Sequence, residues 1–422
     1  MIAGNIKDNK HELVDALYLM LLQGVNQLLP LFVMPYLMIK LGASGYGYVG
    51  FSLSVIQYLV LVVDFGFNLS ATKRIAQVKD NERERNRIFW NVVLAKSLLL
   101  LASSAVLGIL LLVVPTFQLY SKAILATWPM VVGNTFTFMW LFQGIGKVRM
   151  FSVMNTLSKI IVLPLIFIFV KQTDDYVLAA LLQALVFVST AVISNVYLYQ
   201  RHLVKWIAPT CKEARVELSE SFPLFLSTAS TSAYTQLVVI ILGFYCTTEE
   251  MGRYTSADRI MRALCFLLYV PLNQVFFPKI SALAIQCKEQ AQRLFRQVRL
   301  LVVSVMILAG MALFFGGPLL PYVLGKDYAG IQDYLYIMAI APIAIGIGGV
   351  YGQMGLVALG NKQTSKAFRN VYVIAAACSI LMMFVLTPWL KGLGASIVVT
   401  LTEVLVMTLM VYNFNKYKNV CC

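Results

Sequence analysis

The feature that most constrains this chain is a pair of long apolar runs, joined by a short glycine-rich turn, between Pro30 and Arg74. The first run contains Pro30 and Pro35, and the second contains Asp64 and ends at Lys73 and Arg74. About 20 apolar residues in a helix are enough to cross a hydrocarbon core about 30 Å thick. The segment therefore predicts a membrane hairpin, and later parts of the chain repeat its pattern.

The composition agrees with a chain that lies mostly in a membrane. Only 13% of its residues are charged and its mean hydropathy is +0.78, whereas a soluble protein carries about 25% charged residues. The net charge of +15 would suit nucleic acid, but membrane proteins also gather Lys and Arg in their cytoplasmic loops. Because no soluble module is apparent, we expect no nucleic-acid partner.

Hydropathy predicts twelve membrane spans, and thus an all-α polytopic membrane protein. The tenth span is long enough to be tilted or broken. The predicted spans are residues 13–39, 46–68, 89–114, 122–144, 151–171, 176–200, 221–245, 259–280, 298–316, 331–358, 367–388 and 391–414.

The basic residues predict how these spans are oriented. Of the 34 Lys and Arg residues, 24 lie in the loops and termini on one side, and 6 lie in the loops on the other. Loops rich in Lys and Arg stay in the cytoplasm. The sequence therefore predicts that both termini are cytoplasmic.

A weak internal repeat predicts two six-helix halves, residues 1–210 and 211–422. Gly47 and Arg74 are 27 residues apart, as are Gly252 and Lys279, and each pair bounds a span that ends at a basic loop. Parallel repeats of this kind occur in transporters that rock one half against the other. The charged segment 201–220 is the expected linker.

The stretch GYGYVG, with Gly45, Gly47 and Gly50, matches the dinucleotide-binding pattern G-x-G-x-x-G. That pattern needs a preceding strand and a later acidic residue, whereas this stretch lies between two predicted spans. Glycines at such a place permit a tight turn and close helix packing. We interpret the stretch as a packing element.

Motifs for catalysis are missing from the sequence. The two histidines, His11 and His202, lie at predicted cytoplasmic helix ends, and the seven cysteines form no C-x-x-C motif. The chain contains no H-E-x-x-H, G-x-S-x-G or P-loop pattern. We therefore expect no metal, no cofactor and no enzymatic activity.

Polar residues inside the predicted spans are candidates for the lining of an internal cavity, because a charge at mid-membrane costs about 2.5–3.5 kcal/mol on insertion scales. Four of the candidates are cations, which predicts a lumen suited to an anionic substrate. For Lys96, Lys159 and Arg259 the alternative is that each side chain reaches to the membrane interface. The candidate lining residues are Arg259, Arg262, Lys96, Lys159, Asn26 and Asn273.

Arg259 and Arg262 are three residues apart and share a helix face. We expect them to hold an anionic group through charge-assisted hydrogen bonds. The competing interpretation is local pairing with Asp258, or with Glu249 and Glu250.

Two carboxylates, Asp64 and Glu403, lie deep enough in predicted spans to be candidates for ion coupling. Asp64 is the better candidate, because Gln57 and Asn68 share its helix face. Such a group would bind a proton or sodium ion in a polar cavity. Alternatively, Asp64 pairs with a nearby Lys or Arg and only stabilises the bundle.

Several stretches together resemble the Wzx-type O-antigen flippases, in the polysaccharide-transporter branch of the MOP superfamily. They lie in this order: LGASGYGYVGFSLSVIQYLVLVVDFGFNLSATKRIA (41–76), RIFWNVVLAKSLLLL (87–101), ILGFYCTTEEMGRYTSADRI (241–260), LGKDYAG (324–330) and KGLGASIVVTLTE (391–403).

The resemblance implies two six-helix bundles arranged as a V around a central cavity, in the bacterial inner membrane. It also implies transport of a polyprenyl-diphosphate-linked oligosaccharide from the cytoplasmic to the periplasmic leaflet. The expected partners are this substrate, membrane lipids and other polysaccharide-assembly proteins. Because the sequence shows no nucleotide-binding domain, the expected energy source is a proton or sodium gradient, or the lipid gradient itself.

Two alternatives remain from the sequence. One is an ion-coupled multidrug or metabolite antiporter on the same fold, although such antiporters usually carry an acid after the first-span proline and none follows Pro30 in its span. The other is a membrane enzyme of surface-polysaccharide assembly, which the short outer loops disfavour. Lipid II flippases of the superfamily have fourteen spans, against twelve predicted here.

Overall fold

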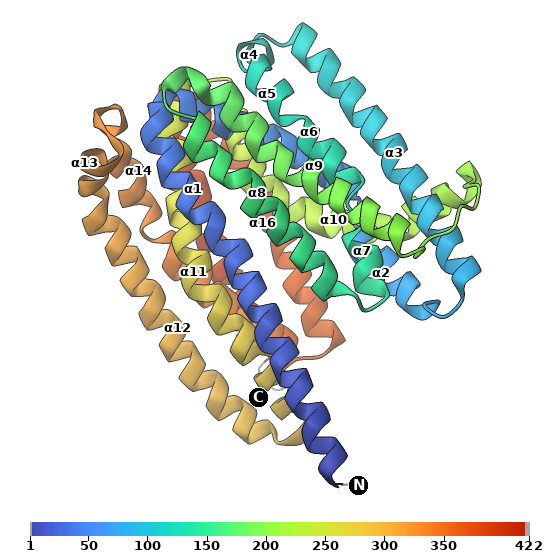
Figure 1. Cartoon of the computed structure of the whole chain (residues 1–422). Helices are drawn as coiled ribbons and strands as arrows, with labels where there is room; N and C mark the ends of the chain where they lie inside the picture. Colours follow the sequence, from blue (N-terminus) through green and yellow to red (C-terminus); the bar gives the residue numbers. More distant parts are fainter. Residues whose placement is uncertain (1, 418–422) are drawn as a thin grey trace. The chain divides into compact units, whose positions relative to one another are not determined.

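The computed structural model describes residues 2–417, apart from the side chains of residues 2–28, 227, 230, 231, 233 and 234. Within these residues every regular element is a helix (Figure 1). This result confirms the all-α class, which the long apolar runs require because a helix satisfies its own backbone hydrogen bonds in lipid.

Nine helical segments among the described residues are long and apolar enough to cross a membrane, so the chain is a multi-pass membrane protein. The count of twelve spans and their arrangement as a V stay predictions. The nine segments are Leu29–Gln77, Glu82–Val113, Ser121–Gly144, Val148–Phe169, Thr173–Gln200, Thr248–Gln286, Lys288–Leu324, Ile331–Ala358 and Lys362–Lys416.

The two longest helices, α1 (Ile2–Asp64) and α16 (Lys362–Lys416), each contain one residue with non-helical backbone angles. In α1 this residue is Gly42, with φ 62°, and in α16 it is Lys391, with φ 47°. A positive φ interrupts a right-handed helix and is easiest for glycine. Both breaks lie where the sequence predicts the junction between two spans.

The helices form two compact units. The first unit contains α1 up to Leu41 and the segment Val55–Thr228, and the second contains Gly42–Ser54 and the segment from Ala229 onward. The predicted halves 1–210 and 211–422 describe the sequence repeat and stay a prediction.

The first unit contains most of the shorter helices. Its helices α8 and α9 pack side by side (Figure 1). Its elements after α1 are α2 (Phe67–Gln77), α3 (Glu82–Val113), α4 (Pro115–Leu119), α5 (Ser121–Thr127), α6 (Pro129–Thr135), α7 (Met139–Gly144), α8 (Val148–Phe169), η1 (Thr173–Asp175), α9 (Tyr176–Gln200) and the first part of α10 (Cys211–Leu242).

The second unit begins within α10. Its helices α11 and α12 pack against each other (Figure 1). Its remaining elements are α11 (Thr248–Gln286), α12 (Lys288–Gly316), η2 (Gly317–Leu319), α13 (Leu320–Leu324), η3 (Lys326–Tyr328), α14 (Ile331–Met338), α15 (Ala341–Gly349), the π-helix η4 (Val350–Ala358) and α16.

An aromatic cluster forms part of the core of the first unit. Phe89 packs edge-on against Phe138, with ring centroids 4.8 Å apart, and lies near Trp140. Phe67 and Phe142 belong to the same buried cluster. Large rings bury much apolar surface and add specific edge-to-face contacts, so this cluster joins α2, α3 and α7.

A glycine contact holds α11 against the Gly42–Ser54 segment in the second unit. A Cβ atom on Gly47 would lie 1.9 Å from the carbonyl oxygen of Thr248, and one on Gly252 would lie 1.7 Å from that of Ala43. Only glycine fits at this separation. The glycines that mark the predicted repeat therefore face each other, and GYGYVG packs helices as its sequence predicts.

Candidate functional site

The Asp64 centre is a group of polar side chains around the carboxylate at the end of α1, in the first unit. Asp64 accepts hydrogen bonds from Lys96 Nζ at 2.9 Å, Asn134 Nδ2 at 3.0 Å and Asn68 Nδ2 at 3.3 Å. Lys96 also donates to the Asn134 carbonyl at 3.2 Å. The four residues come from α1, α2, α3 and α6.

A backbone break positions Asp64 in this centre. Phe65 and Gly66 have φ values of 41° and 80°, so α1 ends at Asp64 and α2 starts at Phe67. A Cβ on Gly66 would lie 2.9 Å from the backbone nitrogen of Phe225, and the Phe65 and Phe225 rings stack 4.4 Å apart. Close packing on α10 therefore maintains the break.

The charges of the Asp64 centre balance one to one. The side chain of Lys96 is 1% exposed and that of Asp64 is 22% exposed. A buried ion pair of this kind is stabilising only while both partners remain. This geometry favours the interpretation that Asp64 stabilises the helix bundle, which the sequence left open. It also means that the charge of Lys96 is already paired with a carboxylate.

The Arg262 centre lies in the second unit and consists of Asp258 and Arg262 on α11 and Glu403 on α16. Arg262 Nε donates to both carboxylate oxygens of Asp258, at 2.9 and 3.0 Å. Glu403, buried like Asp258, lies within the electrostatic field of both residues. Arg262 therefore pairs with Asp258, and Glu403 is a second buried carboxylate that interacts with the same charge only at longer range.

Arg262 keeps an unused donor in this centre. Its Nη2 atom is buried and has no hydrogen-bond partner within the described residues. The sequence left local pairing with Asp258 as the alternative to substrate binding. That pairing is present, but it uses the Nε atom of Arg262 and leaves Nη2 without an acceptor among the described residues. Glu249 pairs instead with Arg253, at 3.3 Å, and Glu250 accepts from the Gly392 backbone at 3.1 Å.

Arg259 lies on α11 and faces an aromatic partner in the same unit. Its Nη1 donates to the Tyr46 hydroxyl at 3.0 Å, and its guanidinium carbon is 5.4 Å from the centre of the Tyr46 ring. Tyr46 is fully buried. Hydrogen bonding and cation–π attraction orient Arg259 without neutralising its charge.

The remaining candidate lining residues are Lys159, Asn273 and Asn26. Lys159 is half-buried on α8, in the first unit. Asn273 lies on α11, and its Oδ1 atom is buried without a hydrogen-bond partner in the described chain. Asn26 lies outside the residues whose side chains the structure describes.

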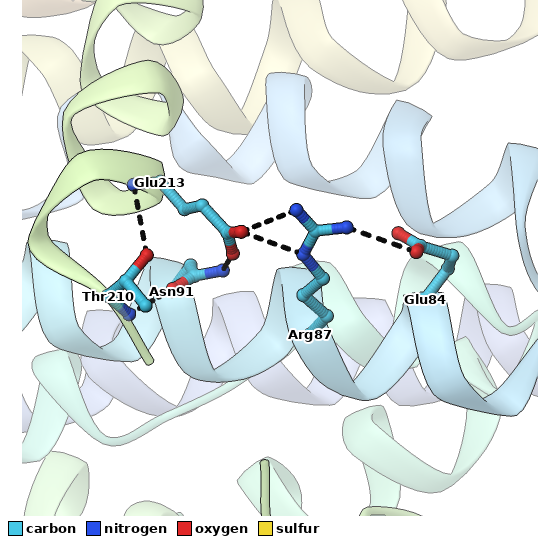
Figure 2. A network of polar contacts seen from close by, with 5 residues as sticks. All are labelled: Glu84, Arg87, Asn91, Thr210 and Glu213. Atoms are coloured by element: carbon cyan, nitrogen blue, oxygen red, sulfur yellow. Dashed lines mark hydrogen bonds and ion pairs between the residues drawn. The ribbon is translucent and has the colours of Figure 1, made fainter. Parts of the chain in front are cut away.

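An ion-pair network that the sequence did not predict lies between α3 and the start of α10 (Figure 2). Arg87 donates to Glu213 through Nε, at 3.0 Å, and through Nη2, and its Nη1 lies 3.2 Å from Glu84. Asn91 also donates to Glu213 and accepts from the Thr210 backbone at 3.0 Å. The hydrogen bonds from Arg87 lower the pKa of Glu213.

The network continues toward α2. Arg74 Nη1 lies 2.6 Å from Glu217 and 3.1 Å from Glu220. Burial of Glu217 raises its pKa to about 7, because desolvation outweighs the attraction of Arg74. Glu213, Glu217 and Glu220 have helical spacing on α10, and this acidic stripe opposite a basic loop was the signal in the sequence.

Solved structures show the same fold. The chain matches "Lipid II flippase MurJ, inward closed conformation" with a TM-score of 0.75 and 14% identity, covering 95% of this chain and 89% of that one. It matches an inward-facing multidrug resistance MATE family transporter of the MOP superfamily with a TM-score of 0.69 and 14% identity, covering 93% and 95% of the two chains.

Sequence comparisons identify the family. Residues 13–284 match the family model described as "Polysaccharide biosynthesis protein". The chain is 30% identical to the "Putative O-antigen transporter" of Escherichia coli (strain K12), over 97% of this chain and 98% of that protein. It is 31% identical to the protein of the same description from Shigella dysenteriae, over 94% and 98%. The chain therefore belongs to the polysaccharide biosynthesis protein family, which confirms its predicted kinship with Wzx-type O-antigen flippases.

Proposed function

We propose that this protein is a flippase for polyprenyl-diphosphate-linked O-antigen oligosaccharides and moves them from the cytoplasmic to the periplasmic leaflet of the bacterial inner membrane. The observation that carries the proposal is the similarity to O-antigen transporters along nearly the whole chain. The relatives and the structural neighbours are transporters, which agrees with a chain that is not an enzyme.

The substrate explains why such a protein needs buried polar groups. A diphosphate with several sugars carries charges and hydroxyls that cannot enter hydrocarbon without replacement of their water. A protein lumen with cations and hydrogen-bond donors replaces that water, while the lipid tail remains in the bilayer. Alternating access between two sides then moves the head group.

Arg262 and Arg259 are the proposed ligands for the diphosphate or for an acidic sugar. Arg262 has a buried Nη2 donor to offer, and Arg259 keeps its positive charge against Tyr46. Charge-assisted hydrogen bonds to an anion are about twice as strong as neutral ones. Lys159, Asn26 and Asn273 remain candidates, whereas Lys96 is matched by Asp64.

We propose that a proton or sodium gradient drives the cycle, with Asp64 and Glu403 as the candidate coupling groups. Asp64 already has a lysine partner. Arg262 pairs with Asp258, so Glu403 has no ion pair of its own among the described residues, and a buried carboxylate without its own cation favours uptake of a proton or cation. The geometry therefore supports Glu403 over Asp64.

The test is flipping by the purified chain in lipid vesicles, with a polyprenyl-diphosphate-linked oligosaccharide as the substrate. We expect movement that an imposed proton or sodium gradient accelerates, and loss of that acceleration in Glu403→Gln but not in Asp64→Asn. Absence of flipping, together with gradient-driven uptake of a cationic drug, would replace the proposal by the antiporter alternative.

The proposed orientation places both termini in the cytoplasm. Single cysteines in the basic loops at residues 79–81 and 287–288 of a variant without native cysteines should resist an impermeant thiol reagent in intact cells. A cysteine at Lys326 should react. Labelling of the basic loops, with protection at Lys326, would reverse the orientation.

A further inference from the structure

A second polar group lies on α11, beyond the Arg262 centre. Tyr269 follows Arg262 by seven residues, which is two helical turns and the same face. Its side chain is buried, and its hydroxyl lies 3.3 Å from Gln353 Oε1, to which it donates a hydrogen bond. Asn273 follows Tyr269 by one turn. These three residues carry no charge, in contrast to Asp258, Arg262 and Glu403.

The element that positions Gln353 is the π-helix η4. π-Helices are rare and occur often at functional sites, because they insert a residue and change which side chains share a face. Two neighbouring helices hold this one: Tyr269 of α11 contacts Gln353, and Arg299 of α12 donates to the Tyr351 hydroxyl at 2.9 Å. The π-helix therefore has bonded side chains on two flanks.

Close packing brings Tyr269 to this element. A Cβ on Gly349, the residue before η4, would lie 2.2 Å from the Tyr269 hydroxyl oxygen. Glycine at 349 is thus required for the approach of the ring. The position of the hydroxyl is set by backbone as well as by Gln353.

Asn273 shows that the group is not saturated. Its Oδ1 atom is buried and has no hydrogen-bond donor within the described part of the chain, although the residue and Gln353 are each only half-buried. Buried acceptors normally have a partner, and each exception needs an explanation. A ligand hydroxyl is a neutral group that would supply the donor.

Tyr372 of α16 interacts electrostatically with both the neutral group and the charged centre. It lies within electrostatic range of Tyr269 on one side and of Glu403 on the other. Along α11, the Arg262 centre is charged and the group around Tyr269 is neutral and forms hydrogen bonds. This order matches a substrate in which an anion is joined to a hydroxyl-rich chain.

We propose that Tyr269, Asn273 and Gln353 form a saccharide subsite, which binds sugar hydroxyls while the Arg262 centre binds the diphosphate. The inference rests on the proposed flippase function and deepens it, because it assigns the sugar and the anion to different residues of the second unit. Tyr269 and Gln353 are then specificity-determining residues, and η4 holds the subsite in register.

The experiment compares two probe lipids in vesicles of phosphatidylethanolamine and phosphatidylglycerol that contain the full chain. One probe is polyprenyl diphosphate carrying a single N-acetylhexosamine, and the other is polyprenyl diphosphate alone. Tyr269→Phe and Gln353→Leu each remove neutral hydrogen bonds, so flipping of the sugar-bearing probe should fall by about threefold to tenfold. Flipping of the bare probe should stay within about twofold.

Controls separate this role from a structural one. Tyr412→Phe changes a tyrosine that is 62% exposed on α16 and should leave both probes unaffected, whereas Arg262→Gln should slow both. Gln353→Asn, which keeps an amide, should retain more sugar-dependent flipping than Gln353→Leu. Melting temperatures in detergent show whether Tyr269→Phe and Gln353→Leu fold as the parent does.

Three results would overturn the inference. The first is equal slowing of both probes with a lowered melting temperature, which would make Tyr269 and Gln353 structural. The second is unchanged flipping of the sugar-bearing probe in both variants. The third is that the parent protein moves neither probe, which would overturn the proposed flippase function and, with it, the saccharide subsite.

Discussion

The two buried charge centres of this chain differ in the balance of their charges. In the first unit, Asp64 and Lys96 match one to one, and Asn68 and Asn134 satisfy the carboxylate further. In the second unit, Arg262 pairs with Asp258, Glu403 is a second buried carboxylate near them, and the Arg262 Nη2 atom has no partner among the described residues. The charges of the first centre are matched, whereas the second keeps a buried carboxylate without an ion pair and a guanidinium donor without an acceptor among the described residues.

The difference teaches which buried charges are available for transport. A charge buried in a membrane protein suggests function, yet that rule selects both centres equally. A matched and fully hydrogen-bonded pair binds further ligands only if it breaks first. In the conformation described, the unmatched centre can bind a ligand without first breaking an ion pair.

The largest effect is expected from Lys96→Met, which breaks the matched centre. Removal of Lys96 leaves the partly buried Asp64 with its two asparagine donors but without a cation, and breaking a buried pair costs up to about 3–5 kcal/mol. We expect a strong fall in the amount of folded protein and in its melting temperature. The double variant Lys96→Met/Asp64→Asn should recover most of the loss, and a double variant as unstable as the single one would show that the pair is not matched.

A smaller effect, on stability alone, should come from Glu217 in the ion-pair network of the first unit. Its pKa of about 7 in the folded state lies above the ordinary value of 4.5, so the folded protein binds the extra proton. The contribution of Glu217 to stability is therefore greatest below pH 4.5 and is lost as the pH rises through 7, by about 3 kcal/mol at most.

Measurement of melting temperature against pH checks this expectation. Glu217→Gln should flatten the curve between pH 5 and 8. An unchanged slope in Glu217→Gln would remove this residue as its source.

The next test is Arg262→Gln, which removes the charge of the unmatched centre. Arg262→Gln also leaves Asp258 without its cation, so flipping is compared at equal amounts of folded protein. Loss of a charge-assisted hydrogen bond to an anion costs about 1.5–3 kcal/mol, so flipping of the lipid-linked oligosaccharide should fall by about tenfold to a hundredfold. Arg259→Lys, which retains the charge, should be milder. Wild-type flipping rates in Arg262→Gln would exclude an anion-binding role.

The smallest effect is expected from Glu84→Ala. Glu84 and Arg87 are both about half exposed and pair at 3.2 Å, while Arg87 keeps its bonds to Glu213 (Figure 2). Exposed pairs contribute about 0–1 kcal/mol, so the melting temperature should move little. A large shift would mean that the Arg87 network depends on Glu84 far more than exposure suggests.

The sequence by itself determined the class of the protein. Apolar runs of membrane length require helices, because lipid offers no partner to an open backbone, and the structure agrees. The glycines of GYGYVG were interpreted as packing residues, and Gly47 against Gly252 fulfils that role. The family, too, is recognisable from the sequence alone, because its motifs occur in a fixed order.

Only the tertiary structure decided how the buried charges are used. Asp64 and Lys96 are 32 residues apart, and Arg262 and Glu403 are 141 apart, so helix spacing gives no information about either pairing. The π-helix at 350–358 could not be predicted from the sequence either, because the segment is as apolar as any membrane span. Composition and periodicity determine which segments enter a membrane, whereas the function of a buried charge depends on the partners that packing brings to it.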